Sequence, residues 1–148
     1  MPKAKTIPDL QKFRAMLKSR GLRATQARLL VHTAMMSLEH ACAEQVAERL
    51  AQEQGAAIST ASVYNVLEQM AVAGVYAFRM SADGKRYYDV CNFSHTHLYD
   101  RKNGIYRNLP EGIIREAVKA VLKQHRFRGY TVESVDVQVV CHRRGQSR

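Results

Sequence analysis

Cysteine is scarce in this sequence and never closely paired. Cys42, Cys91 and Cys141 are its three cysteines, and no Cys-x-x-Cys spacing occurs in the 148 residues. Zinc sites built on cysteine need such pairs, so we expect no structural zinc held by four cysteines. Without a secretory signal, we expect reduced thiols in a cytoplasmic protein. We interpret each lone thiol as a small buried apolar side chain.

Long apolar runs are also missing. The start, MPKAKTIPDLQKFRAM, contains no apolar signal-peptide core, and no later stretch approaches the roughly 20 residues that cross a bilayer. Internal repeats and low-complexity segments are absent too. The sequence predicts no membrane segment, and its length suits one domain of about 100–150 residues or two small ones.

Acidic residues are few relative to basic ones. The chain has 13 Asp and Glu against 23 Lys and Arg, which gives a formal charge of +10 and a pI near 9.9. This balance favours a polyanionic partner, nucleic acid first and an anionic membrane surface second. A basic protein without such a partner is the alternative. The 46% hydrophobic content is enough for a folded core.

Helical spacing of apolar residues predicts four helices in the first half of the chain. A glycine ends the first helix, and Thr25 is a candidate N-cap of the second. The third covers about residues 43–52. The fourth, residues 60–73, lies between the N-cap candidate Ser59 and the stop signal Gly74. Its apolar stripe is formed by Val63, Val66, Leu67 and Met70.

A basic two-stranded ribbon follows the helices. VYAFRM and KRYYDV are predicted strands, joined by SADG, whose Asp83–Gly84 pair favours a hairpin. The ribbon carries Arg79, Lys85 and Arg86. Short helices followed by such a ribbon are typical of a winged helix-turn-helix, whose last helix enters the major groove of double-stranded DNA. A generic amphipathic helix with a solvated face is the alternative.

The polar residues around the start of the fourth helix are the candidate DNA contacts, because a recognition helix presents that end to the bases. Arg23 lies beside the predicted start of the second helix, where it can reach phosphate or the minor groove. The predicted DNA-binding residues are Arg23, Ser59, Thr60, Ser62, Tyr64 and Asn65.

The last third of the chain predicts a smaller α/β unit. NFSHTHLY and GIYRNL are predicted strands joined by a turn, and a helix runs from Pro110 to about His125. A half-buried strand is predicted from the alternation of Val135, Val137 and Val139. A unit of about 58 residues is marginal alone. A homodimer would supply the missing core and suit a palindromic operator. The helix's predicted core face is Ile114, Ala117, Val118, Val121 and Leu122.

The stretch SHTHLYD contains two histidines, His95 and His97. On a strand, side chains two residues apart share one face, so both imidazoles point the same way. Such a pair can hold a metal, but by itself it is more often surface decoration.

Several segments together resemble the ferric uptake regulator family of bacterial metal-responsive repressors, over about residues 10–141. They are GLRATQARLL, HACAEQVAERL, ISTASVYNVLEQMAVAGV, DGKRYYDV and HTHLYDRKNGIY, in the family's order and spacing. The Tyr64–Asn65 pair and the cysteine-free HTHLYDRKNG are most similar to the iron response regulator and peroxide regulator branches.

The resemblance implies one divalent metal per subunit, Fe(II), Mn(II) or Zn(II), held by His40, Asp89, His95 and His97. A further acid of the family's site corresponds here to Asn108, and nearby Glu111 is a possible substitute.

Other metal positions of the family are altered in this chain. The second site's positions hold Ser94 and Thr96, which implies that this site is lost. The structural zinc's first pair corresponds to Asp100 and Asn103. The resemblance therefore implies a dimer held by packing and not by zinc.

The expected fold class is α+β: a winged-helix DNA-binding domain over residues 1–87, a hinge over 88–92, and a dimerisation and metal-sensing domain over 93–148. The expected function is regulation of iron homeostasis or peroxide stress, without enzyme activity. Haem is another possible effector, with an H-x-H imidazole and Cys42 or Cys91 as axial ligands; a repressor released by haem is the first alternative. A non-sensing architectural DNA binder is the second.

A small metal-dependent hydrolase, using Asp89, His95 and His97, is the remaining alternative. It lacks a general-base motif such as H-E-x-x-H, and it leaves the basic winged helix unexplained.

Overall fold

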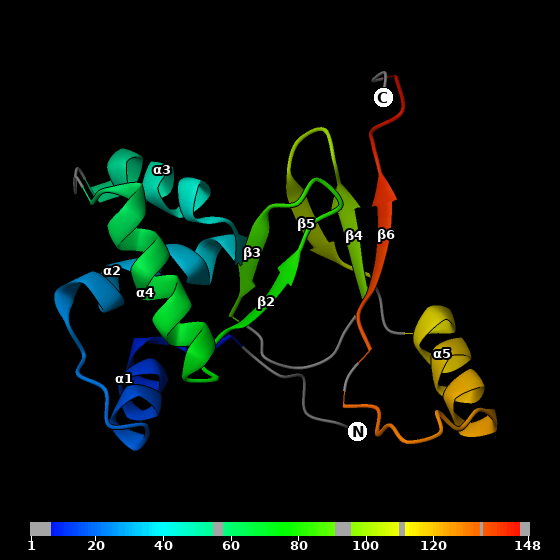
Figure 1. Cartoon of the computed structure of the whole chain (residues 1–148). Coiled ribbons are helices and arrows are strands. Elements are labelled where there is room, and N and C mark those ends of the chain that lie inside the picture. Colours follow the sequence, from blue (N-terminus) through cyan, green and yellow to red (C-terminus); the bar gives the residue numbers. More distant parts are fainter. Residues whose placement is uncertain (1–6, 55–57, 91–95, 110–111, 134, 146–148) are drawn as a thin grey trace. The chain divides into compact units, whose positions relative to one another are not determined.

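The structure, a computed structural model, describes residues 7–54, 58–90, 96–109, 112–133 and 135–145 (Figure 1). The chain folds as two compact units, residues 1–92 and residues 93–148. Helices α1 to α4 and strands β1 to β3 belong to the first unit, and strands β4 to β6 and helix α5 to the second. Within the described ranges, no helix combines the length and the apolar character needed to cross a bilayer.

Local signals set several helix ends in the first unit. The Thr25 hydroxyl accepts a hydrogen bond from the backbone N–H of Arg28 at 3.3 Å, and the Ser59 hydroxyl accepts one from Ser62 at 3.1 Å. Gly74 follows the last helix with a φ of 73°. The predicted caps are confirmed, since each hydroxyl satisfies a helix N–H that has no partner within the helix. The helices are α1 (Leu10–Ser19), α2 (Gln26–Leu38), α3 (Ala43–Gln54) and α4 (Thr60–Val72).

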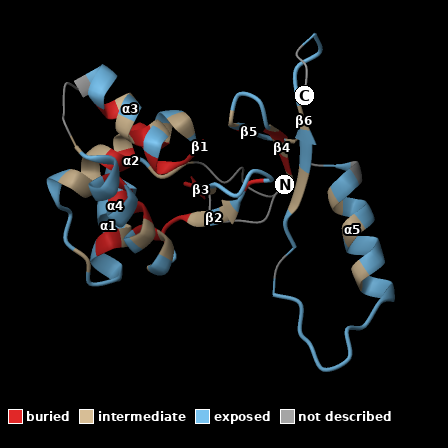
Figure 2. Cartoon of the chain, turned by 45° about the horizontal axis from the view of Figure 1, so that its top comes forward, coloured by how far each residue is buried: buried red, intermediate tan, exposed pale blue. Residues whose placement is uncertain are grey.

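The four helices bury their apolar faces in one core, which Figure 2 shows as buried segments along α1 to α4. The predicted stripe of α4 lies in this core together with Tyr88 from the sheet. The helix that carries the candidate DNA contacts is therefore anchored by its opposite, apolar face. Large fully buried side chains of the core include Phe13, Leu17, Val31, Met35, Val46, Leu50, Leu67 and Met70.

A buried histidine ties α1, α2 and the segment after α4 together. The His32 ring stacks on Phe13 with centroids 3.9 Å apart, and its two nitrogens lie 2.7 Å from the Pro8 carbonyl and the Tyr76 hydroxyl. A carbonyl only accepts hydrogen bonds, so Nε2 donates to Pro8 and Nδ1 accepts from Tyr76. Burial lowers the pKa of His32, against smaller raising effects of the Pro8 hydrogen bond and of Asp9. The fold therefore favours the neutral imidazole.

Because burial lowers the pKa of His32, we expect the protein to lose stability in mild acid. As pH falls below about 6.5, the usual histidine pKa, the unfolded chain takes up a proton that folded His32 resists. We expect the free energy of unfolding to fall between about pH 7 and pH 5, and this contribution to be absent from His32→Phe, which keeps the stacking on Phe13. Urea unfolding of both proteins at several pH values measures the difference. Equal pH dependence would contradict the prediction.

A three-stranded antiparallel sheet completes the first unit, in the order β1-β3-β2. Its strands are β1 (His40–Ala41), β2 (Ala77–Met80) and β3 (Arg86–Asp89). With the four helices it forms the predicted winged helix-turn-helix. The hairpin β2–β3 was predicted, whereas the two-residue β1 was not. Asp89, which we expected in a hinge over residues 88–92, is the last residue of β3.

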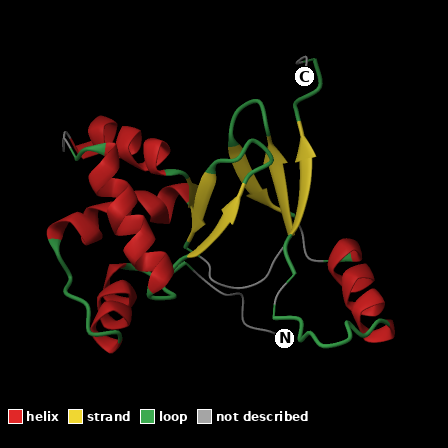
Figure 3. Cartoon of the chain, in the orientation of Figure 1, coloured by secondary structure: helices red, strands yellow, loops and turns green. Residues whose placement is uncertain are grey.

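The second unit is a three-stranded sheet with one helix (Figure 3). Central β4 (Thr96–Asp100) pairs antiparallel with β5 (Ile105–Asn108) and parallel with β6 (Val137–Cys141). Helix α5 (Ile113–Gln124) connects β5 to β6 in the chain. The mixed helix and sheet content of the two units agrees with the predicted α+β class.

The predicted apolar face of the second unit is only partly covered in the single chain. Ile114 and Val121 of α5 are 37% and 54% exposed, and Val139 and Val140 of β6 are 38% and 47% exposed. Val135, expected in the last strand, precedes it. Val139 and Val140 are neighbours on one strand and point to opposite faces, yet both are exposed, so the predicted alternation of buried and exposed residues does not hold there. Among the described residues, no segment covers either side chain.

Candidate metal centre and DNA-contact residues

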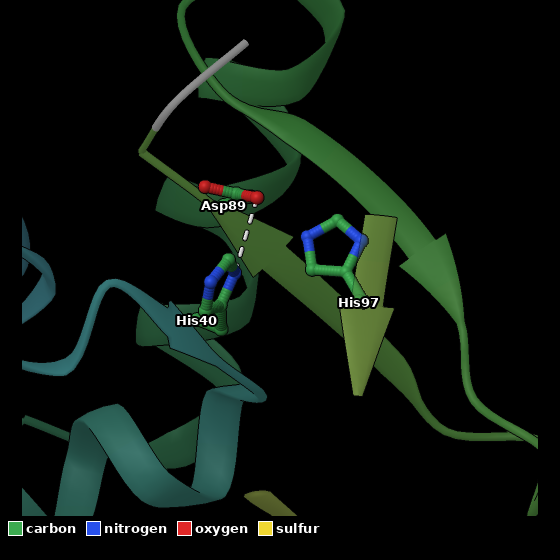
Figure 4. Close-up of side chains that lie close together, drawn as sticks. All are labelled: His40, Asp89 and His97. Atoms are coloured by element: carbon green, nitrogen blue, oxygen red, sulfur yellow. Dashed lines mark ion pairs between the residues drawn. The ribbon is translucent and has the colours of Figure 1, made fainter. Parts of the chain in front are cut away.

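The pairing of β1 with β3 brings His40 and Asp89 together. The two residues are direct partners in the strand register, so their side chains lie on the same face of the sheet. The His40 Nδ1 atom lies 3.1 Å from Asp89 Oδ2, and both side chains are almost fully buried (Figure 4). Two residues separated by half of the first unit's sequence thus form one buried imidazole–carboxylate pair.

Strand β2 adds a cation to the same face. Ala77 is the register partner of Asp89, and Arg79 follows it by two residues, so Arg79 is the diagonal neighbour of the aspartate. Its Nη2 atom lies 3.6 Å from Asp89 Oδ2. We had interpreted Arg79 as part of a basic, DNA-facing ribbon. That interpretation is wrong, because the Arg79 side chain is only 10% exposed and pairs within the sheet.

A second basic residue of the β2–β3 ribbon also forms an ion pair. Arg86 lies on the opposite face of the sheet, where its Nε atom is 2.8 Å from the Glu68 carboxylate of α4. The same carboxylate accepts a hydrogen bond from the Tyr88 hydroxyl, and the Arg86 guanidinium stacks on Phe78. These contacts attach the β2–β3 hairpin to α4. Lys85 in the turn remains exposed.

His97 belongs to β4 of the second unit and is labelled in Figure 4. It is fully buried, its ring meets Tyr106 edge-on, and its Nδ1 atom lies 3.7 Å from Asp136. Asn108, at the position of the missing acid, is the register partner of His97 on β5. No sequence pattern pairs His97 with Asp136, whose carboxylate lies beside the imidazole.

The remaining candidate ligands lie outside the described residues. They are His95, the alternative acid Glu111, and Cys91. Cys42 is described and buried, and burial is the main cause that raises the pKa of its thiol. A raised pKa disfavours the thiolate that axial haem ligation requires.

The donor chemistry of these residues fits a divalent transition metal. Imidazole nitrogen and carboxylate oxygen suit Fe(II), Mn(II) and Zn(II), and a buried carboxylate needs a positive partner. His40 and Asp89 supply one donor of each kind from adjacent strands.

The candidate DNA contacts of α4 lie where the sequence predicted, at its exposed N-terminal end. Thr60, Ser62, Tyr64 and Asn65 are exposed, and Tyr64 is 43% exposed despite its aromatic ring. Ser59 has a capping role as well, since its hydroxyl accepts the Ser62 N–H and donates to the Ser62 hydroxyl at 2.9 Å. These two hydroxyls are therefore partly engaged within the helix.

Arg23 is exposed in the segment before α2, and Arg28 holds that segment in place. The Arg28 guanidinium donates to the Arg23 carbonyl at 2.8 Å and to Gln69 of α4 at 3.1 Å. Sequence reasoning missed Arg28, because nothing local shows that α4 lies within its reach.

Comparison with known proteins gives a family and several similar structures. The ferric uptake regulator family matches residues 19–140. No curated protein sequence matches the chain. The Vibrio cholerae ferric uptake regulator is 24% identical, with a TM-score of 0.71 over 87% of this chain and 99% of that chain. The Pseudomonas aeruginosa ferric uptake regulator with manganese is 22% identical, with a TM-score of 0.66 over 88% of this chain and 97% of that chain.

A third structure, a zinc-bound manganese uptake regulator, is 25% identical, with a TM-score of 0.67 over 86% of this chain and 97% of that chain. These likenesses support the fold, and the family match covers both units. The chain therefore belongs to the ferric uptake regulator family, whose members are DNA-binding transcription regulators and not enzymes.

Proposed function

We propose that this protein is a metal-responsive repressor in which His40, Asp89, His95 and His97 hold one divalent metal per subunit. The observation that carries the proposal is the buried His40–Asp89 pair within the winged-helix unit. Imidazole and carboxylate without thiolate suit Fe(II), Mn(II) or Zn(II). Family membership removes the hydrolase alternative.

In this proposal the ligands couple the two units. His40 and Asp89 belong to the first unit, and His97 to the second. A metal held by residues of both units would stabilise one relative orientation of the units. In a dimer, that orientation sets the spacing of the two recognition helices, about 34–36 Å for half-sites one turn apart. Metal and DNA then favour the same conformation, and each strengthens binding of the other.

The proposal assigns a different role to each unit. Residues 1–87 bind DNA through Arg23 and the start of α4, and residues 93–148 dimerise and contribute to metal sensing. The proposed hinge over residues 88–92 overlaps the end of β3 (Arg86–Asp89). Regulation of iron homeostasis or of the peroxide response is the expected biological setting.

Operator binding by metal-stripped protein tests the function directly. Mn(II), Fe(II), Zn(II) and haem are added separately, and affinity for a palindromic operator is measured at fixed salt. Tighter binding with one of the metals supports the proposal. Strong binding without metal, released by haem, supports the haem-responsive alternative. Metal-independent affinity that no addition changes supports an architectural DNA binder.

We also expect a homodimer that persists without zinc. The exposed apolar residues of α5 and β6 need a cover, and a cavity of about 170 Å³ lies between α5 and the strands. Burial against a second copy would stabilise the unit by roughly 25 cal/mol per Å² of apolar surface. Light scattering after exhaustive chelation tests this. A shift to monomer would reveal a structural metal on which the dimer depends.

A further inference from the structure

Arg79 occupies a position beside the proposed metal ligands that nothing in its local sequence explains. We propose that Arg79 is an internal counter-ion, which competes with the metal for the Asp89 carboxylate and so raises the free metal concentration at which the site fills. This inference rests on the proposed metal site. It assigns a new role to a residue that is not itself a metal ligand.

The sheet geometry directs the Arg79 side chain toward Asp89. Residues two apart on a strand share a face, so Arg79 lies on the same face as Ala77, the register partner of Asp89. A diagonal neighbour is within reach of a long side chain. The guanidinium uses this reach, with Nη2 at 3.6 Å from Asp89 Oδ2. His40 approaches the same oxygen from the other side of β3, at 3.1 Å.

Burial strengthens the interaction between Arg79 and Asp89. The Asp89 and Arg79 side chains are 1% and 10% exposed, so solvent screens them little. A buried carboxylate without a positive partner is strongly unfavourable, and arginine remains charged at any relevant pH. In the metal-free protein, Arg79 therefore stabilises the ionised carboxylate, the form that a metal needs.

The same charge opposes metal binding. A divalent cation on Asp89 would face the guanidinium at short range, and their repulsion in a weakly screened site is substantial. Arg79 must give up its contact or tolerate a second cation beside it. Either way, part of the gain from metal binding is lost. The positive charge that stabilises the empty site thus weakens the filled one, as reciprocal coupling requires.

Mn(II) titration calorimetry on the metal-stripped full-length protein tests the proposal. Arg79→Met removes the charge and keeps the length of the side chain, and Arg79→Lys keeps the charge. Arg14→Met is the control, because it removes an equal charge from an exposed residue of α1. We expect Arg79→Met to lower the Mn(II) dissociation constant by roughly 5- to 150-fold, the usual range for coupling between two ligands. Arg79→Lys and Arg14→Met should stay near the wild-type value.

A second measurement needs no metal. Chemical unfolding of the metal-free wild type, Arg79→Met, Asp89→Asn and the double variant forms a double-mutant cycle. The two changes should be clearly non-additive, since each removes the partner of the other. Arg79→Gln replaces Arg79→Met in both measurements if the methionine variant does not fold.

The outcomes separate this inference from the proposed function. If the wild type takes up no Mn(II), Fe(II) or Zn(II), the metal site itself is wrong and the inference fails with it. If the wild type binds metal but the folded Arg79→Met protein binds Mn(II) no more tightly, only the role of Arg79 is overturned. Strict additivity in the metal-free cycle overturns it as well.

Discussion

Replacement of His97 by alanine is expected to abolish both tight metal binding and any effect of metal on operator affinity. His97 is fully buried on β4, and its imidazole is the described donor that the second unit contributes to the proposed site. Loss of a direct ligand should cost more than the roughly 10- to 100-fold loss that follows removal of an outer-shell partner. Metal content after dialysis and operator titration measure the two effects.

Variants of the other proposed ligands distinguish metal binding from the effect of metal on operator binding. His40→Ala should retain partial metal binding but lose most of the effect on DNA, because the winged-helix unit then contributes only Asp89. His95→Ala should behave like His97→Ala. If its metal content is unchanged, His95 is an ordinary surface histidine.

A histidine outside the proposed site provides the matched control. His125 is exposed just after α5, and His125→Ala should bind metal and operator like the wild type. Thermal unfolding of each variant confirms that loss of metal does not follow from loss of the fold. If His97→Ala keeps full metal content, the proposed ligand set is wrong.

The helices and turns were predictable because their signals are local. Thr25, Ser59 and Gly74 each act within a few residues of their own position, so the sequence alone locates the start of α2 and both ends of α4. Strand β1 has no such signal. Its two residues become a strand only by pairing with β3, and that pairing depends on the folded core.

The family resemblance named candidate ligands, but the sequence did not show which residues surround them. His40 and Asp89 were identified from the family resemblance, since no spacing rule connects residues so far apart in the chain. Arg79 was misinterpreted because its partner depends on the β2–β3 register. Asp136 was missed because its pairing with His97 depends on how the parallel strand β6 aligns with β4.

The apolar face of α5 shows a different limit of the sequence. Its helical periodicity was identified correctly, yet Ile114 and Val121 are exposed in the single chain. A periodic pattern indicates which face is apolar, but it does not identify the surface that covers that face. If another molecule covers this face, the spacing of apolar residues in the sequence does not show it.

Replacement of Arg23 and of Tyr64 is expected to weaken operator binding in two distinguishable ways. Arg23 is exposed before α2, where a guanidinium can reach phosphate or the minor groove. Arg23→Ala should weaken binding to all sequences alike and reduce the slope of log affinity against log salt by about one unit. Arg126→Ala, which removes an exposed charge from the second unit, should keep the slope.

Tyr64 is expected to act on specificity. It projects from α4 away from the buried stripe and is 43% exposed, although an aromatic side chain gains by burial. If its ring or hydroxyl meets a base edge, Tyr64→Ala should cost about 1–3 kcal/mol on the operator and much less on unrelated DNA. Tyr64→Phe separates the hydroxyl from the ring. Fluorescence anisotropy on operator and scrambled duplexes at several salt concentrations measures both effects, and wild-type binding by Arg23→Ala and Tyr64→Ala would show that α4 does not dock in this way.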